Sequence, residues 1–492
     1  MELKVKNLNW IAGRPVVILG KKTAERMNIF ADDRVAIYYP KKVYAVVDIF
    51  PKIVREGEIG LSQELSRILD LKNSEKIEVG TSEVSDATRL IRKKLQGESL
   101  TKKEIQSIIS EIVHNNLTEA EIAYFTAAEK LGGMSLEETV NLTKAMVNTG
   151  TKLRFKKGKV ADKHCIGGIA GNRTTPIIVS ICAAAGLILP KTSSRAITSA
   201  SGSADVIETI SNVKLSIKEI KDVVRKTNAC MVWGGSLGLA PSDDKIIRVE
   251  RLLNLDIEPQ LLASIMSKKI ASGSKYLIID IPVGSGSKME SIKKAKNLGR
   301  KFTQIAKIFK MKIKIVYSNG KNPVGDGVGP VLEMLDIIAV LKNDPSAPQD
   351  LRKKSLHFAS SLMALCGIKN STKKAEEILF SGKAYEKFKE IINAQNKSDD
   401  FNERIENLKL AKYSKVIKSK RAGRITKISN HGINSTCRIL GTPETISAGI
   451  YLHKHLGEVK RKEPLMTLYS ESKSKIKDAL KFIKYDNPFR II

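Results

Sequence analysis

The residues that decide the fold read DKHCIGGIAGN (162–172), then TTPIIVSICAAAGL (174–187), which runs into LILP (187–190). They predict a glycine-rich loop, a buried helix and a buried strand in succession. Further along the chain, YLIIDIPVG (276–284) and KIKIVYS (312–318) predict two more buried strands. We expect helices within the intervening stretches 287–310 and 329–342. Alternation of strands and helices indicates an α/β domain with a mostly parallel sheet.

Other segments surround this α/β core, and the chain is expected to be a multidomain α/β protein. The first part is rich in β-branched and aromatic residues, as in VVILG, RVAIYY and VYAVVDIF, and predicts a small N-terminal β-barrel-like module. Helical periodicity follows, opened by the capping boxes Thr101/Glu104, Thr118/Glu121 and Ser135/Glu138. A second helical stretch, RLLNLDIEPQLLASIMSKKIA (251–271), is expected to join the same bundle, which makes the helical domain split.

The C-terminal part is expected to be a separate β-rich domain. Strands are predicted in RITKIS, STCRIL, ISAGIYLH and LMTLYS. The preceding stretch KYSKVIKSKRAGRITK (412–427) has seven Lys or Arg and no acid, and predicts a linker or an edge. The expected domains are the N-terminal module at 1–84, the helical domain at 85–160 with 240–272, the α/β domain at 161–239 with 273–420, and the C-terminal β-rich domain at 421–492.

Composition narrows the class of protein. The 492 residues are 42% hydrophobic, which is enough for packed cores and excludes a disordered tail protein. The net charge of +32 favours anionic partners. Aromatic residues make up only 5% and do not interleave with the basic ones, so we expect no specific nucleic-acid site. The five cysteines are scattered and form no CxxC, which predicts reduced thiols and no metal site. The N-terminus has no apolar core and the chain has no long apolar run, so we expect a cytoplasmic protein without a membrane span.

The loop 162–172 is the first candidate for chemistry. Its glycines let the backbone approach a ligand, its N–H groups can hold an anion, and Lys163 adds a full charge. A helix that starts near Thr174 adds positive potential at its N-terminus. The alternative is a tight turn that only packs a helix on a sheet.

The second candidate is KTSSRAITSASGSADVIE (191–208), where six small hydroxyl side chains fall within eleven residues. It follows a predicted strand, and in open α/β sheets ligands bind at the carboxyl ends of the strands. The functional interpretation is a hydrogen-bonding wall for phosphate and sugar hydroxyls. The alternative is a solvated loop with a helix cap.

Two further segments carry isolated polar residues. The strand YLIIDIPV ends in glycines and Lys288, which taken alone is an exposed cation. Asp256 precedes a helical stretch on which Ser264 and Lys268, spaced i and i+4, share one face. A lone Asp256 is otherwise an ordinary surface acid.

Four motifs together, DKHCIGG, SSRAITSASGSADVIE, ASIMSKK and VGSGSKM, resemble in order and spacing the signature segments of the thymidine/pyrimidine-nucleoside phosphorylase family. The form KHCIGG…GNRTTPI…PKTSSRAITS, with the extra N-terminal module, is similar to the archaeal AMP-phosphorylase branch of that family. The resemblance covers nearly the whole chain. It implies an active site in the cleft between the helical and α/β domains, and a homodimer or a larger assembly.

The resemblance also implies a reaction, part of AMP catabolism and nucleotide salvage. Inorganic phosphate attacks C1′ of AMP, with CMP and UMP as other possible substrates, and gives the free base and ribose 1,5-bisphosphate without a metal or redox cofactor. By position, Asp256 is implied as the proton donor, Lys163, Cys165 and Thr174 as phosphate-binding residues, and Lys268 as a possible base contact. The residues implied to bind AMP are Gly168, Ser194, Arg195, Ala196, Ile197, Thr198, Ser199, Ser203, Ser264 and Lys288.

The chain departs from the pyrimidine enzymes at two positions. Cys165 stands where they have a serine, and a thiol is a weaker hydrogen-bond donor. Val249 stands where they have an arginine that binds the base, which favours a purine substrate. Two phosphoryl groups bring about four negative charges, for which the candidate cations are Arg173, Lys191, Arg195 and Lys288. The alternatives are a pyrimidine-nucleoside phosphorylase, a phosphoribosyltransferase of the anthranilate type and a nonenzymatic scaffold or nucleic-acid-binding protein.

Overall fold

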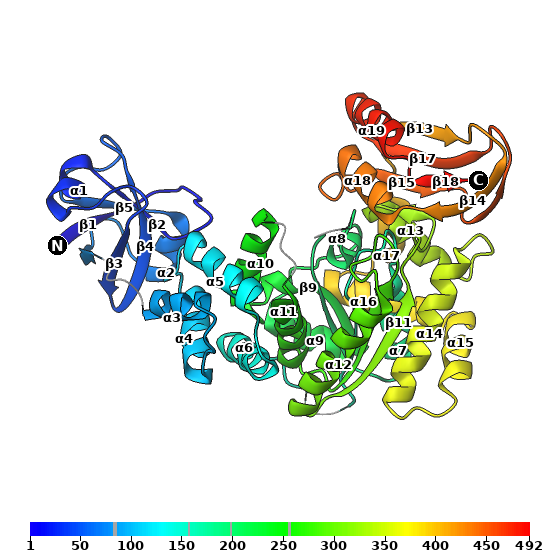
Figure 1. Cartoon of the computed structure of the whole chain (residues 1–492), viewed down its shortest axis with the longest axis horizontal. Coiled ribbons are helices and arrows are strands. Elements are labelled where there is room, and N and C mark those ends of the chain that lie inside the picture. The colour runs from blue at the N-terminus through cyan, green and yellow to red at the C-terminus, as the bar shows by residue number, and fades with distance from the viewer. Residues whose placement is uncertain (82–85, 156–157, 197–198, 254–256) are drawn as a thin grey trace. The chain divides into compact units, whose positions relative to one another are not determined.

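The computed structural model describes residues 1–81, 86–155, 158–196, 199–253 and 257–492 (Figure 1). The chain divides into two compact units, residues 1–149 with 240–264 and residues 150–239 with 265–492. The fold is mixed α/β with a helical bundle and an α/β part, as expected. The finer domain boundaries given above remain predictions.

The first unit begins with a closed six-stranded barrel in the order β1-β5-β2-β4-β3-β6. Alternation builds its core: in β1, Leu3 and Val5 are buried while Glu2 and Lys4 are exposed. The elements of this part are β1 (Glu2–Asn7), β2 (Val16–Leu19), α1 (Lys21–Met27), β3 (Arg34–Tyr39), β4 (Lys41–Ile49), β5 (Glu58–Leu61), α2 (Gln63–Leu69) and β6 (Lys76–Thr81).

The remainder of the first unit is helical. The three predicted capping boxes are present, with the Thr101, Thr118 and Ser135 hydroxyls accepting backbone N–H groups. The run expected as one helical stretch at 251–271 is divided between two helices, α10 and α11. The helices are α3 (Asp86–Leu95), α4 (Lys102–Val113), α5 (Glu119–Gly132), α6 (Leu136–Thr149), α10 (Pro241–Leu253) and α11 (Glu258–Ala271), the last of which continues into the second unit.

The second unit contains parallel strands in the orders β11-β10-β7 and β8-β9, and a parallel bridge between Val160 and Ile188 links the two groups. The carboxyl ends of these strands therefore share one edge. The strands are β7 (Ala161–Cys165), β8 (Leu189–Ser193), β9 (Ala229–Trp233), β10 (Tyr276–Val283) and β11 (Lys312–Asn319).

Helices pack against these strands and enclose one large apolar core that includes Ile177, Phe358 and Phe388. Helix α7 is apolar in sequence and is buried along most of its length, so it contributes much of this core. The helices are α7 (Thr174–Ala184), α8 (Ser203–Glu208), α9 (Ile217–Thr227), α12 (Ile292–Ile308), α13 (Pro330–Leu341), α14 (Gln349–Leu365), α15 (Ser371–Phe380), α16 (Lys383–Asn396) and α17 (Phe401–Glu406).

The last part of the chain forms two small sheets, β12-β15-β17-β13 and β16-β14-β18, that pack with two helices. Its elements are β12 (Gly327–Val328), β13 (Tyr413–Lys418), β14 (Gly423–Ile428), α18 (Asn430–Leu440), β15 (Gly449–Leu452), β16 (Gly457–Val459), β17 (Pro464–Ser470), α19 (Lys473–Tyr485) and β18 (Phe489–Ile491).

One prediction for this part needs correction, and another is decided between its two alternatives. STCRIL (435–440) is not a strand but lies in α18, because Ser429 caps the helix and Ile433, Cys437 and Leu440 are buried at helical spacing. Of the two alternatives for the stretch 412–427, a linker or an edge, the structure shows the edge: the stretch forms β13, at the edge of its sheet, and most of β14.

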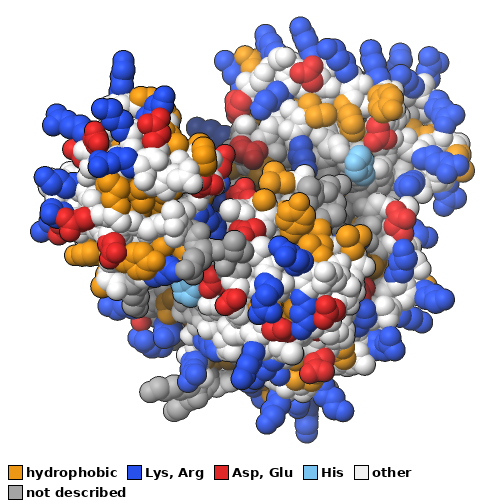
Figure 2. Space-filling model, turned by 60° about the vertical axis from the view of Figure 1, so that its left-hand side comes forward, with side chains coloured by type: hydrophobic (Ala, Val, Ile, Leu, Met, Phe, Trp, Pro, Cys, Tyr) orange, Lys and Arg blue, Asp and Glu red, His pale blue; other side chains and the backbone are white. Residues whose placement is uncertain are grey.

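On the face that Figure 2 shows, charged side chains do not gather in one place. Figure 2 shows Lys and Arg side chains scattered among acidic and hydrophobic ones over the visible face. None of the helices in the described ranges is both long enough and apolar enough to span a membrane. All five cysteines are free thiols.

Candidate active site

Four loops meet at the carboxyl edge of the parallel strands. They follow β7 (166–173), β8 (194–202), β10 (284–291) and β11 (320–326). Because the strands are parallel, the loops that leave them start from the same edge. Three of the four predicted motifs, all but ASIMSKK, lie on these loops.

The glycine-rich loop 166–173 touches two of its neighbours. The Asn172 N–H donates to the Val324 carbonyl at 2.7 Å, and the Val324 N–H donates to the Ala170 carbonyl at 3.1 Å. Gly168 has φ +93°, and a Cβ there would lie 2.9 Å from the Lys288 backbone nitrogen. Only glycine fits this left-handed position and close approach. Gly168 and Lys288, both implied to bind AMP, are thus brought together.

Lys163 and Thr174 form a buried polar pair next to this loop, and Cys165, which is half-buried, lies at the end of the same strand as Lys163. The Lys163 Nζ donates to the Thr174 Oγ1 at 3.1 Å and lies 3.7 Å from the Asp280 carboxylate, which is fully buried. The Asn172 Nδ2 contacts the Cys165 sulfur at 3.6 Å. Burial raises the pKa of the Cys165 thiol, so the thiol stays protonated at neutral pH. These three residues, predicted to bind phosphate, lie where β7 meets the N-terminus of α7.

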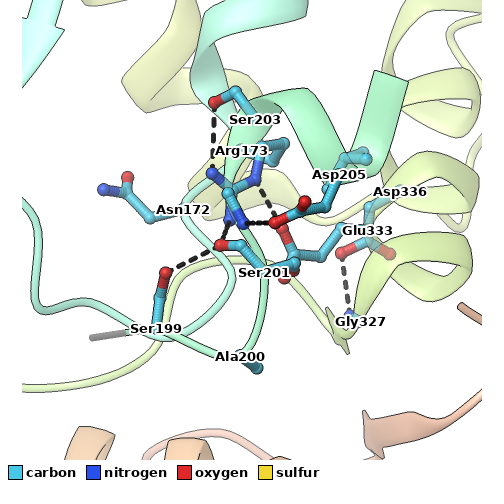
Figure 3. Close-up of polar contacts among 12 residues, drawn as sticks. Asn172, Arg173, Ser199, Ala200, Ser201, Ser203, Asp205, Gly327, Glu333 and Asp336 are labelled. Carbon is cyan, nitrogen blue, oxygen red and sulfur yellow. Dashed lines mark hydrogen bonds and ion pairs between the residues drawn. The ribbon is translucent and has the colours of Figure 1, made fainter. Parts of the chain in front are cut away.

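Arg173 joins this loop to the serine-rich loop 194–202 (Figure 3). Its guanidinium donates to the Glu333 carboxylate, to the Ser201 carbonyl at 2.8 Å and to the Ser203 hydroxyl at 3.2 Å. The Ser201 hydroxyl also donates to Glu333. Burial raises the pKa of Glu333, against the opposing effect of Arg173. Arg173 therefore ties the start of α7 to the start of α8.

Asp205 holds the beginning and the end of the serine-rich loop. Its Oδ2 accepts the Ala196 N–H at 2.7 Å and the Gly202 N–H at 2.8 Å, and its Oδ1 accepts Arg195 at 3.0 Å. A Cβ on Gly202 would lie 2.5 Å from the Ser194 carbonyl oxygen, so the loop is closed tightly on itself. The Ser199 hydroxyl donates to the Ser201 carbonyl at 2.7 Å.

The candidate cations Arg173, Lys191 and Arg195 are paired with carboxylates. Arg173 pairs with Glu333, and Arg195 pairs with Asp205 and Glu208 while it stacks 5.0 Å from the Trp233 ring. Lys191 is buried beside Asp162. Their positive charge is thus largely compensated within the protein, which gives the backbone N–H groups and the N-terminus of α7 a larger share in holding an anion.

A buried triad lies behind the loops, on the other side of β7 from Lys163. Asp162 carries two lysines, with Lys269 Nζ at 2.7 Å and Lys191 Nζ at 3.5 Å. Burial acts to raise the pKa of Asp162, but the two ammonium groups outweigh it and the pKa is lowered. Burial lowers the pKa of Lys191 to about 7, and burial together with the lysines lowers that of His164 well below its usual value.

Some predicted residues lie elsewhere or outside the described residues. In the first unit, the Ser264 hydroxyl donates to Asp243 at 2.8 Å. Lys268 is in the second unit, on α11, near enough to His164 to affect its pKa. Asp256, Ile197 and Thr198 lie outside the described residues.

Sequence reasoning missed the residues that hold the loops in place: Asp205, Asp280, Glu333, Asn430 and Asn434. The Ala170 N–H donates to Asn430 and the Ala200 N–H to Asn434, both on α18. Asp205 had a signal, because it stands three residues after Gly202 at a helix start. The others are far away in the sequence, and no local pattern marks them.

Comparisons with known proteins agree with this architecture. Residues 88–150 match the helical bundle domain of a glycosyl transferase family, and residues 157–293 match its α/β domain. An AMP phosphorylase of Pyrococcus furiosus is 39% identical over 100% of this chain and 98% of the relative. AMP phosphorylase 1 of Archaeoglobus fulgidus is 38% identical over 99% of this chain and 97% of the relative.

Among solved structures, an anthranilate phosphoribosyltransferase of Thermus thermophilus superposes with a TM-score of 0.53 at 16% identity. The match covers 62% of this chain and 99% of that one. At this identity the likeness concerns the fold alone.

Proposed function

The chain belongs to the AMP phosphorylase family, and from this premise we propose that it catalyses the phosphorolysis of AMP. In this reaction an oxygen of inorganic phosphate forms a bond to C1′ while the bond from C1′ to the adenine nitrogen breaks. The electron pair of that bond leaves with adenine, which takes up a proton. The products are adenine and ribose 1,5-bisphosphate.

One observation supports the proposal most strongly. The loops that carry the phosphate-binding and AMP-binding motifs meet at one edge of the parallel strands, with Gly168 against Lys288 and Arg173 against Ser203. A site for two phosphoryl groups on one ribose needs two such anion-holding segments close together.

On the phosphate side, we assign the attacking phosphate to Lys163, Cys165 and Thr174. The ammonium of Lys163, the Thr174 hydroxyl and the N-terminus of α7 all favour an anion at this place. Holding the phosphate against C1′ supplies proximity and offsets the positive charge that develops on the sugar.

On the nucleotide side, we assign AMP to Gly168, residues 194–199, Ser203, Ser264 and Lys288, and the base contact to Lys268. Hydroxyl and backbone N–H groups dominate this set. The cations that we consider for the 5′-phosphate are Arg173, Lys191, Arg195 and Lys288.

The leaving base needs a proton donor, which we assign to Asp256 on the strength of the motif. A free aspartate has a pKa of about 3.9, so the site has to raise it by roughly two units or more for the acid to be protonated near neutral pH. Asp256→Asn is expected to lower kcat at least ~100-fold with an unchanged fold. A kcat near that of the wild type would remove Asp256 from this role.

Base preference is open to the same assay. Val249, at the position of the base-binding arginine of the pyrimidine enzymes, is 2% exposed and packs in the core of the helical bundle. We therefore expect AMP to be preferred, with CMP and UMP as weaker substrates and pyrimidine nucleosides as poor ones.

The test is to incubate the protein with each nucleotide and nucleoside, with and without phosphate, and to measure the released base. Release of adenine that requires both AMP and phosphate supports the proposal. Release that is unchanged without phosphate, or a preference for thymidine, contradicts it. The homodimer, the cytoplasmic location and the lack of a specific nucleic-acid partner stay predictions.

A further inference from the structure

We propose that helix α18, in the C-terminal β-rich part, positions two ligand loops, the glycine-rich loop 166–173 through Asn430 and the serine-rich loop 194–202 through Asn434. The inference rests on the proposed function for its kinetic consequences. It gives the C-terminal part a task that the motifs did not assign: α18 contains none of the residues predicted to touch a substrate.

Asn430 holds the glycine-rich loop 166–173. Its side chain is fully buried, its Oδ1 accepts the Ala170 N–H at 3.0 Å, and its Nδ2 donates to the Gly320 carbonyl at 3.0 Å. One side chain thus bridges the loops after β7 and β11. Ala170 is two residues from Gly168, so a shift at Ala170 is expected to move the backbone that we assign to the substrates.

Asn434 does the same for the serine-rich loop. It stands one helical turn after Asn430 and is 6% exposed, and its Oδ1 accepts the Ala200 N–H at 3.0 Å. Residues four apart lie on one face of a helix, so one stripe of α18 faces both loops. Arg438, a further turn along, extends this stripe toward the Ser199 carbonyl, at 3.5 Å.

Packing strengthens both attachments. Ala170 and Ala200 are 0% and 1% exposed and belong to the same hydrophobic cluster as Ile433 and Cys437 of α18. Each loop therefore inserts one small residue into the core of the C-terminal part and has its N–H accepted there by an asparagine. Removing the acceptor leaves a buried donor unpaired, which favours displacement of the loop.

The two asparagines act on different loops, so their effects on the substrates are expected to separate. Asn430→Leu is expected to raise the KM for inorganic phosphate about five- to tenfold, as the loss of a buried hydrogen bond implies, and to raise the KM for AMP as well, because the same loop carries Gly168. Asn434→Leu is expected to raise the KM for AMP alone, with the KM for inorganic phosphate within about twofold of the wild type. A purely structural role would lower stability without separating the two constants.

Gln395 provides the matched control. It is a buried amide on α16, its Oε1 accepts the Met231 N–H at 2.6 Å, and its Nε2 donates to the Ser211 hydroxyl at 2.9 Å. None of its partners lies on either ligand loop. Gln395→Leu is expected to lower the Tm and to leave both KM values unchanged.

Asn434→Asp keeps an acceptor for Ala200 and is expected to restore part of the AMP affinity.

Hydrogen exchange tests the proposal independently of activity. In the full-length protein, Asn430→Leu is expected to speed exchange in a peptide over residues 166–173, and Asn434→Leu in one over 199–203, each leaving the other peptide unchanged. If a leucine variant does not fold, the serine variant, whose shorter side chain does not reach the amide, is measured instead.

Unchanged exchange at both loops, or equal increases of both KM values in both variants, overturns the proposal. If the wild-type protein releases no adenine from AMP and phosphate, the proposed function fails. Hydrogen exchange alone then decides whether α18 holds the loops.

Discussion

The triad of Asp162, Lys191 and Lys269 permits a prediction about charge balance inside the protein. All three side chains are almost fully buried, and they combine one carboxylate with two lysines. Removing one lysine leaves a balanced pair, whereas removing the carboxylate leaves two buried amines without a counter-charge. Asp162→Asn is therefore expected to be the most harmful single change in this group.

The magnitude follows from the pKa values. Keeping a lysine of pKa 10.5 neutral at pH 7 costs about 5 kcal/mol relative to the unfolded chain, and breaking a buried pair costs about 3–5 kcal/mol. We expect Asp162→Asn to lower the free energy of unfolding by ~3–5 kcal/mol. We expect Lys191→Met not to destabilise the protein and to raise the free energy of unfolding by up to ~4 kcal/mol at pH 7, because burial has lowered the pKa of Lys191 to about 7 and the folded wild type already bears most of that cost.

The same group gives a pH dependence with a defined sign. Between pH 7 and 10.5 the unfolded chain holds the proton of Lys191 while the folded protein has lost it. The free energy of unfolding of the wild type therefore rises with pH across this window through this group, and it falls as the pH drops toward 7. Lys191→Met is expected to lack that rise.

Urea denaturation at pH 7.0 and pH 9.5, followed by tryptophan fluorescence, measures these differences. The chain has two tryptophans, and Trp10 lies between β1 and β2, so a Trp10→Phe background leaves Trp233 of β9 as the reporter of the α/β part. The reasoning is refuted if Lys191→Met destabilises as much as Asp162→Asn, or if the wild type and Lys191→Met show the same change with pH.

Three further changes have defined outcomes. Cys165→Ser replaces a weak hydrogen-bond donor beside Asn172 by a stronger one and is expected to lower the KM for phosphate ~3- to 10-fold in steady-state kinetics. An unchanged or higher KM would count against a contact between residue 165 and phosphate. Asp336→Asn removes a buried acid whose pKa is raised to about 8, mainly by burial, so the folded wild type holds more protons than the unfolded chain between pH 3.8 and 8 and loses stability as the pH rises. From pH 5 to pH 8.5 the variant is expected to gain up to ~4 kcal/mol over the wild type in urea titrations, and parallel curves would contradict this. Gly168→Ala places a methyl group 2.9 Å from the Lys288 nitrogen and is expected to lower kcat/KM about 100-fold with little loss of Tm, whereas a change under threefold would show that the two loops separate freely.

Local patterns in the sequence were enough for the parts of the site that lie within one segment. The order of strand, glycine loop and helix at 161–184 is predictable because glycines, Lys163 and the helix start at Thr174 are neighbours in the chain. The capping boxes are predictable for the same reason, because each joins residues only three apart in the chain. STCRIL was misread because β-branched residues in a short window favour a strand, whereas the helical spacing of Ile433 and Cys437 extends beyond that window.

The partners that hold the site could not be read in this way. Glu333 meets Arg173 across 160 residues, and Asn430 meets Ala170 across 260. Such pairs depend on how distant elements pack, which a single sequence does not display. Arg195 is an example. The sequence alone makes it a candidate to bind a phosphate, whereas in the structure its charge is paired with Asp205 and Glu208.

The attachment of two early loops to α18 bears on how the protein is made. A ribosome adds roughly 5–20 residues per second, so on the order of tens of seconds separate the emergence of Ala170 from that of Asn430, 260 residues later. During that interval the nascent chain has its glycine-rich and serine-rich segments but lacks the acceptors that fix them. Competence for ligand therefore arrives at the end of translation, and a chain cut short before residue 430 is expected to be inactive even where its preceding helices and strands have formed.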